Sequence, residues 1–302
     1  MYKYIGEYPK DRENGWSDEL QGVCHDEENW FFTQKGKMWK FPVSHNLNKK
    51  ISKSDIDGEK IICMDYGYHL GDIDCFNGYL FVPVVDDGYP YIAVFSAKDL
   101  KFITKQIIKR NGNYFDSLGW CAINPTNGKL YTSDRHISDK IEDDKSPIIV
   151  YNVDYEAIAN RSDKFLSSFC TLIPYTESGE NIYLKHSQGG CFDDKNNLHL
   201  VNGYPHSYGT RGISIYKVPT MPEYGEKYAI KRISQSEQDG EFRYQFKVSV
   251  GEEPEGITYW DLNNIKTKAP EIKGVLHVIM IDNYGTNDDD LYFKHYDRID
   301  KK

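Results

Sequence analysis

Side chains able to bind a small polar ligand lie next to a glycine that recurs along the chain. Amides, imidazoles and carboxylates exchange hydrogen bonds with a ligand, and an indole stacks on an apolar ring face. The candidate binding residues are Gln21, His69, Asp72, Trp120, His186, Gln188 and Glu255. The structural alternative is that the same side chains line a water-filled channel and bind one another.

Carboxylates in this set also suit hydrolysis. Glycosidic cleavage needs a pair of carboxyl groups several ångströms apart, one as acid and one as base or nucleophile. Glu255 or Glu253 is the candidate acid, and Asp72 or Asp74 is the candidate base, although Asp74 can instead point between neighbouring sheets. A hydrolase of the glycosidase or lactonase kind, using Asp72 and Glu255, is therefore the alternative to simple binding.

A metal is the third possibility, because carboxylate oxygens are the ligands that Ca²⁺ prefers. The acidic loops 288–290 and 86–87 supply such oxygens, as does Asp72 together with Glu255. An acidic run on the surface is, however, more often simply solvated. Calcium is thus the one cofactor that these residues suggest.

The elements that must position these residues follow from an internal repeat. Three columns recur five times: a glycine, a short alternating strand, and a strand centred on one aromatic residue, with a fourth apolar run after most copies. The glycines are Gly22, Gly71, Gly119, Gly189 and Gly256, and the aromatic residues are Phe41, Phe95, Tyr151, Tyr216 and Phe293. Short antiparallel strands that repeat at this spacing are typical of β-propeller blades.

The repeat predicts an all-β, five-bladed propeller that fills residues 1–302 as one domain. The blades are expected at about 20–65, 69–108, 118–173, 187–250 and 254–297. The last copy lacks a fourth strand, and residues 2–8 form an alternating strand without a local partner, so they should complete that blade and close the ring. Residues 223–243 leave room for extra strands, and 154–160 suggest a helical turn. A β-sandwich gives no reason for the columns to return in the same order.

This repeat pattern resembles that of five-bladed β-propellers such as tachylectin-type lectins, arabinanase- and levansucrase-type glycosidases and calcium-activated nucleotidases. The resemblance lies in the repeat and covers nearly the whole chain, whereas no motif assigns one of these families. It implies a site on the face that carries the loops into the inner strands and the loops between second and third strands. Those loops contain, among others, Tyr68, Tyr89, Tyr114, Asp134, His136, Tyr183, Tyr204, His206, Tyr208, Arg211 and Tyr284.

Composition limits the partners. The net charge of −9 disfavours nucleic acid and anionic lipid, whose phosphates would be repelled, and leaves glycans, cations and small polar molecules. No apolar run of membrane-spanning length and no signal peptide is evident, so we expect a monomer in the cytoplasm, with secretion by a non-classical route still open. Phosphate-loop, nucleophile-elbow and zincin motifs are absent from the sequence.

The cysteines fit this interpretation. Cys24, Cys121 and Cys191 follow the repeated glycine in three different copies, so they are expected to be buried packing residues on separate blades. We expect all six cysteines to be free thiols, as in a reducing compartment. The preferred function is recognition of a sugar-like or small polar ligand, followed by the hydrolase and by a protein-interaction scaffold.

Overall fold

The structure is a computed structural model that describes residues 1–9, 16–51, 61–86, 88–110, 112–135, 147–184, 186–203, 212–236, 241–244, 252–263, 269, 271–282 and 291–299. Within these ranges the chain is built from β-strands and one short helix, α2 (Tyr155–Ala159). The Asp154 side chain accepts a hydrogen bond from Ala157 N at 2.9 Å and caps this helix. The predicted helical turn at 154–160 is therefore confirmed.

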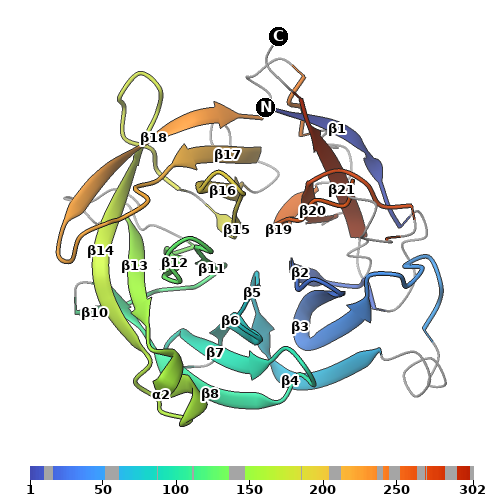
Figure 1. Cartoon of the computed structure of the whole chain (residues 1–302), viewed down its shortest axis with the longest axis horizontal. Helices are drawn as coiled ribbons and strands as arrows, with labels where there is room; N and C mark the ends of the chain where they lie inside the picture. The colour runs from blue at the N-terminus through green and yellow to red at the C-terminus, as the bar shows by residue number, and fades with distance from the viewer. Residues whose placement is uncertain are drawn as a thin grey trace.

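Consecutive strands pair antiparallel into groups that stand radially around a common centre (Figure 1). Further pairing joins the first two groups into a sheet of seven strands and the next two into a sheet of eight strands. The first group consists of β2 (Leu20–His25), β3 (Asn29–Pro42) and β4 (Ile62–Leu70). The second consists of β5 (Asp74–Phe76), β6 (Tyr79–Val85), β7 (Tyr91–Ser96) and β8 (Phe102–Ile107). The third group consists of β11 (Ala122–Ile123), β12 (Leu130–Thr132), β13 (Ile148–Val153) and β14 (Leu166–Tyr175). The fourth consists of β15 (Ser187–Phe192), β16 (Asn197–Asn202), β17 (Gly212–Lys217) and β18 (Lys227–Gln235). The last group is β19 (Glu253–Tyr259), β20 (Leu276–Ile281), β21 (Leu291–Arg298) and β1 (Tyr2–Glu7). The strands β2, β5, β11, β15 and β19 lie nearest the centre.

The long element β3 contains a hairpin. Val43 N donates to Glu28 O at 2.7 Å, so the residues that flank its two ends are adjacent. Gly36 has a φ of +96° near the middle of β3, a conformation that glycine adopts without steric cost. The two predicted strands at 29–33 and 40–43 thus lie at the two ends of this element.

The N-terminal strand β1 pairs with the C-terminal strand β21. Their register runs antiparallel from Tyr2 opposite Arg298 to Glu7 opposite Lys294. Beyond β1, Tyr8 N donates to Phe293 O at 3.0 Å, and Tyr2 and Tyr8 are both buried. In the 223–243 region, β18 pairs antiparallel with β17 and parallel with β14, which joins two neighbouring sheets at their outer edges.

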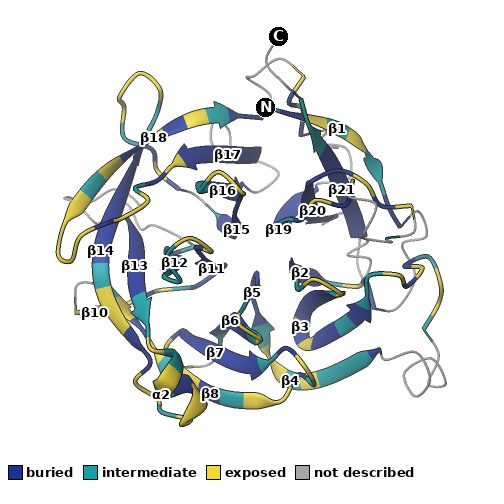
Figure 2. Cartoon of the chain, viewed as in Figure 1, coloured by how far each residue is buried: buried dark blue, intermediate teal, exposed yellow. Residues whose placement is uncertain are grey.

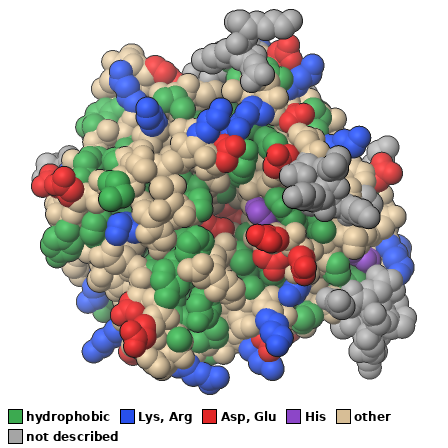
Figure 3. Space-filling model, viewed as in Figure 1, with side chains coloured by type: hydrophobic (Ala, Val, Ile, Leu, Met, Phe, Trp, Pro, Cys, Tyr) green, Lys and Arg blue, Asp and Glu red, His purple; other side chains and the backbone are tan. Residues whose placement is uncertain are grey.

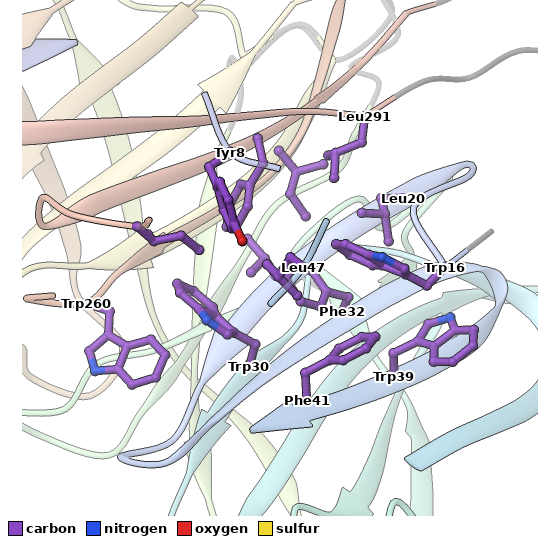
Figure 4. Packing of buried hydrophobic residues seen from close by; sticks show 14 of the residues in the cluster. Tyr8, Trp16, Leu20, Trp30, Phe32, Trp39, Phe41, Leu47, Trp260 and Leu291 are labelled. Carbon is purple, nitrogen blue, oxygen red and sulfur yellow. The ribbon is translucent and has the colours of Figure 1, made fainter. Parts of the chain in front are cut away.

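The hydrophobic core lies between neighbouring groups of strands rather than in one central mass. Figure 2 shows the buried residues concentrated on the inner and middle strands of each group. One cluster packs the aromatic residues of β3 against Ile279 and Phe293 of the last group, so the first and last sheets face each other across it (Figure 4). Four further clusters fill the spaces between consecutive groups. This layered arrangement is that of a β-propeller-like fold.

Charged side chains are unevenly spread on the face seen in Figure 3. Most Lys and Arg side chains there lie toward the periphery, while acidic and histidine side chains reach the hollow at the centre. Among the described residues, no helix is long and apolar enough to span a lipid bilayer.

Candidate functional site

The repeated glycines bring the inner strands into backbone contact around the axis. A Cβ atom on Gly256 would lie 2.7 Å from Gly22 Cα, one on Gly119 would lie 2.5 Å from Ser187 O, and one on Gly71 would collide with Gly119 O. These separations are shorter than real carbon contacts allow. The glycine column is therefore required by packing, and it leaves little open space where the inner strands meet.

Asp72 occupies the centre of this ring. Its Oδ1 accepts a hydrogen bond from Val23 N at 3.0 Å, and its Oδ2 accepts from Gly190 N at 2.9 Å and from Ile257 N at 3.2 Å. The main chain of Asp72 also donates to Gly119 O at 2.8 Å. One carboxylate thus ties together inner strands from β2, β15 and β19. Burial raises the pKa of Asp72 well above its usual value, although the three N–H donors act in the opposite direction.

Two of the predicted binding residues are buried away from any opening in the described structure. Asp72 and Trp120 are both 0% exposed, and Trp120 Nε1 donates to Ser133 Oγ at 3.0 Å. Because the Asp72 oxygens face three N–H donors, a cation there would meet like charge. Among the described residues no group of three or more His, Cys, Asp and Glu side chains could hold a metal ion.

A hollow of about 330 Å³, measured with its open mouth, lies where the chain enters the inner strands. Gln21, His69, Gln188 and Glu255 line it, and all four are predicted site residues. The rest of the lining includes Ser117, Leu118 and Arg135. His186 does not belong to this lining. It is half-buried with a φ of +50°, and its carbonyl oxygen accepts from Gly203 N at 3.0 Å.

A β-bulge delivers each of three lining side chains to the hollow. The pairing of β2 with β3 skips from Leu20 to Gly22, that of β15 with β16 from Ser187 to Gly189, and that of β19 with β20 from Pro254 to Gly256. The skipped residues are Gln21, Gln188 and Glu255, each directly before the repeated glycine. A bulge re-aims the extra side chain out of the ladder. Equivalent bulges therefore place an amide, an amide and a carboxylate around one opening.

Gln188 connects two buried carboxylates. Its Nε2 donates to Glu253 Oε1 and, at 3.2 Å, to Glu255 Oε1. Arg135 approaches Glu253 Oε1 with Nη2 at 3.4 Å, and its Nε is buried without a hydrogen-bond partner in the described structure. Next to this network Lys294 and Glu252 form an ion pair of 2.8 Å in which both side chains are fully buried. Glu252 and Glu253 thus each have a cationic partner, and Glu255 accepts from the neutral amide of Gln188.

His69 is oriented by Gln21. Its Nε2 lies 2.7 Å from Gln21 Oε1, and because an amide oxygen only accepts, Nε2 carries the proton. Burial lowers the pKa of His69, and the positive charges of Arg135 and Lys35 lower it further. The neutral ring then has its lone pair on Nδ1, which makes no hydrogen bond with the described residues. This lone pair can accept a proton or a hydrogen bond from a ligand.

The sequence interpretation missed Arg135 and Ser117. Arg135 stands between Asp134 and His136, two residues of a loop already expected on this face, and its basic side chain in an acidic loop was the available signal. Several candidate loop residues fall outside the described ranges. They are Asp87, His136, Tyr204, His206, Tyr208, Arg211, Tyr284 and the acidic run 288–290. Asp74 lies between neighbouring sheets, where its Oδ2 accepts from Ile123 N at 2.6 Å.

No protein-family model and no curated protein matches this chain. Among solved structures, a glutaminyl cyclase from Myxococcus xanthus is similar, with a TM-score of 0.53, 11% identity, and coverage of 99% of this chain and 97% of that one. A PQQ-bound aldose sugar dehydrogenase from Streptomyces coelicolor gives a TM-score of 0.47 at 10% identity, with 98% of each chain covered. These neighbours are β-propeller-like folds. At such identities the likeness establishes the fold alone, so function must come from the site.

Proposed function

We propose that the protein is a ligand-recognition propeller whose hollow binds a sugar-like or other small polar molecule. The supporting observation is the convergence of Gln21, His69, Gln188 and Glu255 from three different groups of strands onto one opening, with Arg135 beside them. Three of the four are bulged residues, and Gln188 and Glu255 are locked in position by their mutual hydrogen bond. Side chains held in fixed orientations bind a ligand at a lower entropic cost.

Hydrogen-bonding capacity in the hollow indicates a ligand with several hydroxyl or amine groups. His69 Nδ1 accepts in the neutral ring, and Arg135 Nε donates without a partner among the described residues. Both residues belong to the lining of the same opening. A polyol satisfies donors and acceptors together because each hydroxyl does both. Calcium remains a proposed ligand only for the acidic loops 288–290 and 86–87.

The experiment is a thermal-shift screen of sugars, other polyols, nucleotides and divalent cations on the full chain. A ligand that binds only the native state raises the melting temperature. We expect Gln188→Ala and Glu255→Gln to abolish the shift caused by a hit. Glu180→Gln removes one exposed carboxylate elsewhere and serves as the matched control. If every shift survives both hollow variants, the hollow is not the binding site, and a protein-interaction scaffold becomes the better account.

The second candidate is a hydrolase of the glycosidase or lactonase kind. A neutral histidine held by Gln21 in a hollow that also contains Glu255 favours it, because the pair offers a base and an acid. Asp72, the partner expected from sequence, has both oxygens engaged by main-chain N–H groups. We therefore propose His69 in its place. Assays with aryl glycosides, lactones and, because a glutaminyl cyclase shares the fold, a glutaminyl peptide should lose turnover in His69→Asn while binding survives.

We further propose that the strand groups are five blades and that β1 closes the ring. The β1–β21 pairing and the aromatic cluster between the first and last sheets support this arrangement. A closed ring has no free sheet edge to seed aggregation.

A further inference from the structure

Two exposed tyrosines form a ready-made stacking surface. The rings of Tyr89 and Tyr114 are parallel within 12°, with centroids 3.6 Å apart, although the residues are 52% and 38% exposed. Lys109 Nζ lies 4.5 Å from the Tyr114 centroid, and because Tyr89 already covers one face of that ring, the cation covers the other. Tyr114 is thus enclosed on both faces. The outer face of Tyr89 has no ring or hydrogen-bond partner in the described structure.

The support beneath Tyr89 is rigidly anchored. Tyr114 belongs to β10 (Asn113–Tyr114), which pairs with β9 (Lys109–Arg110). Arg110 Nη1 bonds to Asp134 Oδ2 at 2.6 Å in a largely buried ion pair, and Tyr151 Oη donates to Lys109 O at 2.9 Å. Two independent contacts therefore fix the hairpin to β13 and to the segment after β12. An exposed surface that is held in place loses little entropy when a ligand stacks on it.

The tyrosine pair is linked through short stretches of chain to two residues that line the hollow. Asp134, which holds the hairpin, directly precedes Arg135 of the lining. Val85, another lining residue, precedes Tyr89 by four positions, so their Cα atoms are at most about 14 Å apart. A few linked sugar rings can bridge a separation of up to this length.

We propose that the outer face of Tyr89 is a stacking subsite for one ring of an oligosaccharide whose neighbouring unit lies in the hollow. This inference rests on the proposed sugar-binding function. The apolar face of a pyranose packs on an aromatic ring, while its hydroxyl groups remain free to bond at the edges. A nucleobase chain is disfavoured by the net charge of −9.

The test compares wild-type protein with Tyr89→Ala by isothermal titration of α- and β-1,4-linked glucose oligomers of one to four units. The subsite predicts that affinity rises with length and that Tyr89→Ala weakens binding of the longer oligomers about five- to tenfold without changing monosaccharide binding. Tyr89→Trp should preserve or improve the long-oligomer affinity. Tyr114→Ala, which removes the support, should act like Tyr89→Ala.

Tyr224→Ala is the control, because Tyr224 is a 76% exposed tyrosine on the connection between β17 and β18. Suppose that glucose binds, that Gln188→Ala weakens glucose binding, and that Tyr89→Ala leaves the affinity for oligomers unchanged. The subsite is then wrong and the proposed function stands. If no saccharide binds, the subsite is wrong and the hollow must be assigned to another ligand of the screen. Tyr89-dependent binding of a tryptophan-containing peptide, with no saccharide binding, also overturns the proposal.

Discussion

Asp72 is a structural carboxylate rather than an accessible one. It lies in the column that follows the repeated glycine, and the equivalent residues Val23, Gly190 and Ile257 supply the N–H groups that it binds. The other copies carry no acidic side chain at this position. This one side chain therefore satisfies three main-chain N–H donors that packing has removed from water.

Replacing this carboxylate should destabilise the whole ring. In Asp72→Asn one acceptor oxygen becomes an NH₂ group that faces a main-chain donor, so at least one buried N–H loses its partner. Each such loss costs about 1–3 kcal/mol. Urea unfolding followed by circular dichroism should reveal the lower stability, with Asp86→Asn, in a more exposed loop, as the control. If Asp72→Asn had the same urea midpoint as the wild type, the Asp72 side chain would not be bound to the three main-chain N–H groups as described.

Asp74 gives a testable pH dependence. Burial raises its pKa to about 7, although Ile123 N and Cys75 N donate to it. Between pH 4 and 7 the unfolded chain loses this proton while the folded chain keeps it, so stability falls as pH rises, with a slope on the order of 1 kcal/mol per pH unit. Other groups titrate in the same range, so the difference between wild type and Asp74→Asn is the informative quantity.

Denaturant midpoints of both proteins at half-unit steps of pH isolate this contribution. The asparagine keeps an acceptor oxygen but cannot ionise, so the fall in stability from pH 4 to 7 should be shallower than in the wild type. Parallel pH profiles for the two proteins would contradict a protonated Asp74 in the fold.

At the scale of the elements, the glycine column and the bulge before it act together. The glycine allows close approach of the inner strands, and the bulge turns the preceding side chain toward the hollow. A Cβ on Gly256 would meet Gly22 Cα at 2.7 Å and Val23 N at 2.9 Å, both main-chain atoms that cannot move aside.

Gly256→Ala should therefore prevent a stable fold or lower its stability by several kcal/mol, since the strands must separate. Gly88→Ala is the matched control, because its Cβ would meet only the end of the Asp86 side chain, at 3.1 Å. Thermal melting and soluble yield of both variants measure the difference. Equal melting temperatures would show that the inner strands are looser than described.

The terminal strand β1 makes a second prediction at this scale. Its removal uncovers the edge of β21, loses the buried rings of Tyr2 and Tyr8, and leaves His295 Nε2 without the Tyr8 carbonyl oxygen, which lies 3.1 Å away. Deleting residues 1–9 should lower the melting temperature and promote aggregation, measured by light scattering on heating. A truncated protein as soluble and heat-stable as the full chain would refute closure by β1.

At the scale of the whole molecule, all six cysteines are free, as expected from their positions in the repeat. Cys24, Cys121, Cys170 and Cys191 are buried, whereas Cys63 and Cys75 are partly exposed. Burial raises the pKa of the Cys63 thiol, so its alkylation is slow at neutral pH. No thiol has the depressed pKa that marks a reactive nucleophile within the described structure.

Native alkylation with iodoacetamide at pH 8 should label at most the two partly exposed cysteines, and alkylation in denaturant without reductant should label all six. Intact-mass measurement counts the labels. A disulfide that involves Cys24, Cys121 or Cys191 would contradict their separation on different inner strands.

The repeat can be recognised in the sequence because every copy packs against its neighbours in the same way. Each sheet that packs on its neighbours repeats a glycine at the axis, an alternating strand and one aromatic residue. This periodicity predicts the all-β propeller class and the positions of the strands. The count of unpaired sheet edges predicts the pairing partner of residues 2–7. The four lining residues Gln21, His69, Gln188 and Glu255 were likewise found by their place beside the glycine.

Only the tertiary structure separated these residues from Asp72 and Trp120, which occupy the next column. A sequence period assigns a side chain to one face of a strand, but a bulge reverses that assignment locally, and ladder register is set by partners far along the chain. The ion pair of Arg135 with Glu253 and the stack of Tyr89 on Tyr114 join residues from different groups of strands or connections. Such contacts depend on how sheets pack, which no single stretch of sequence encodes.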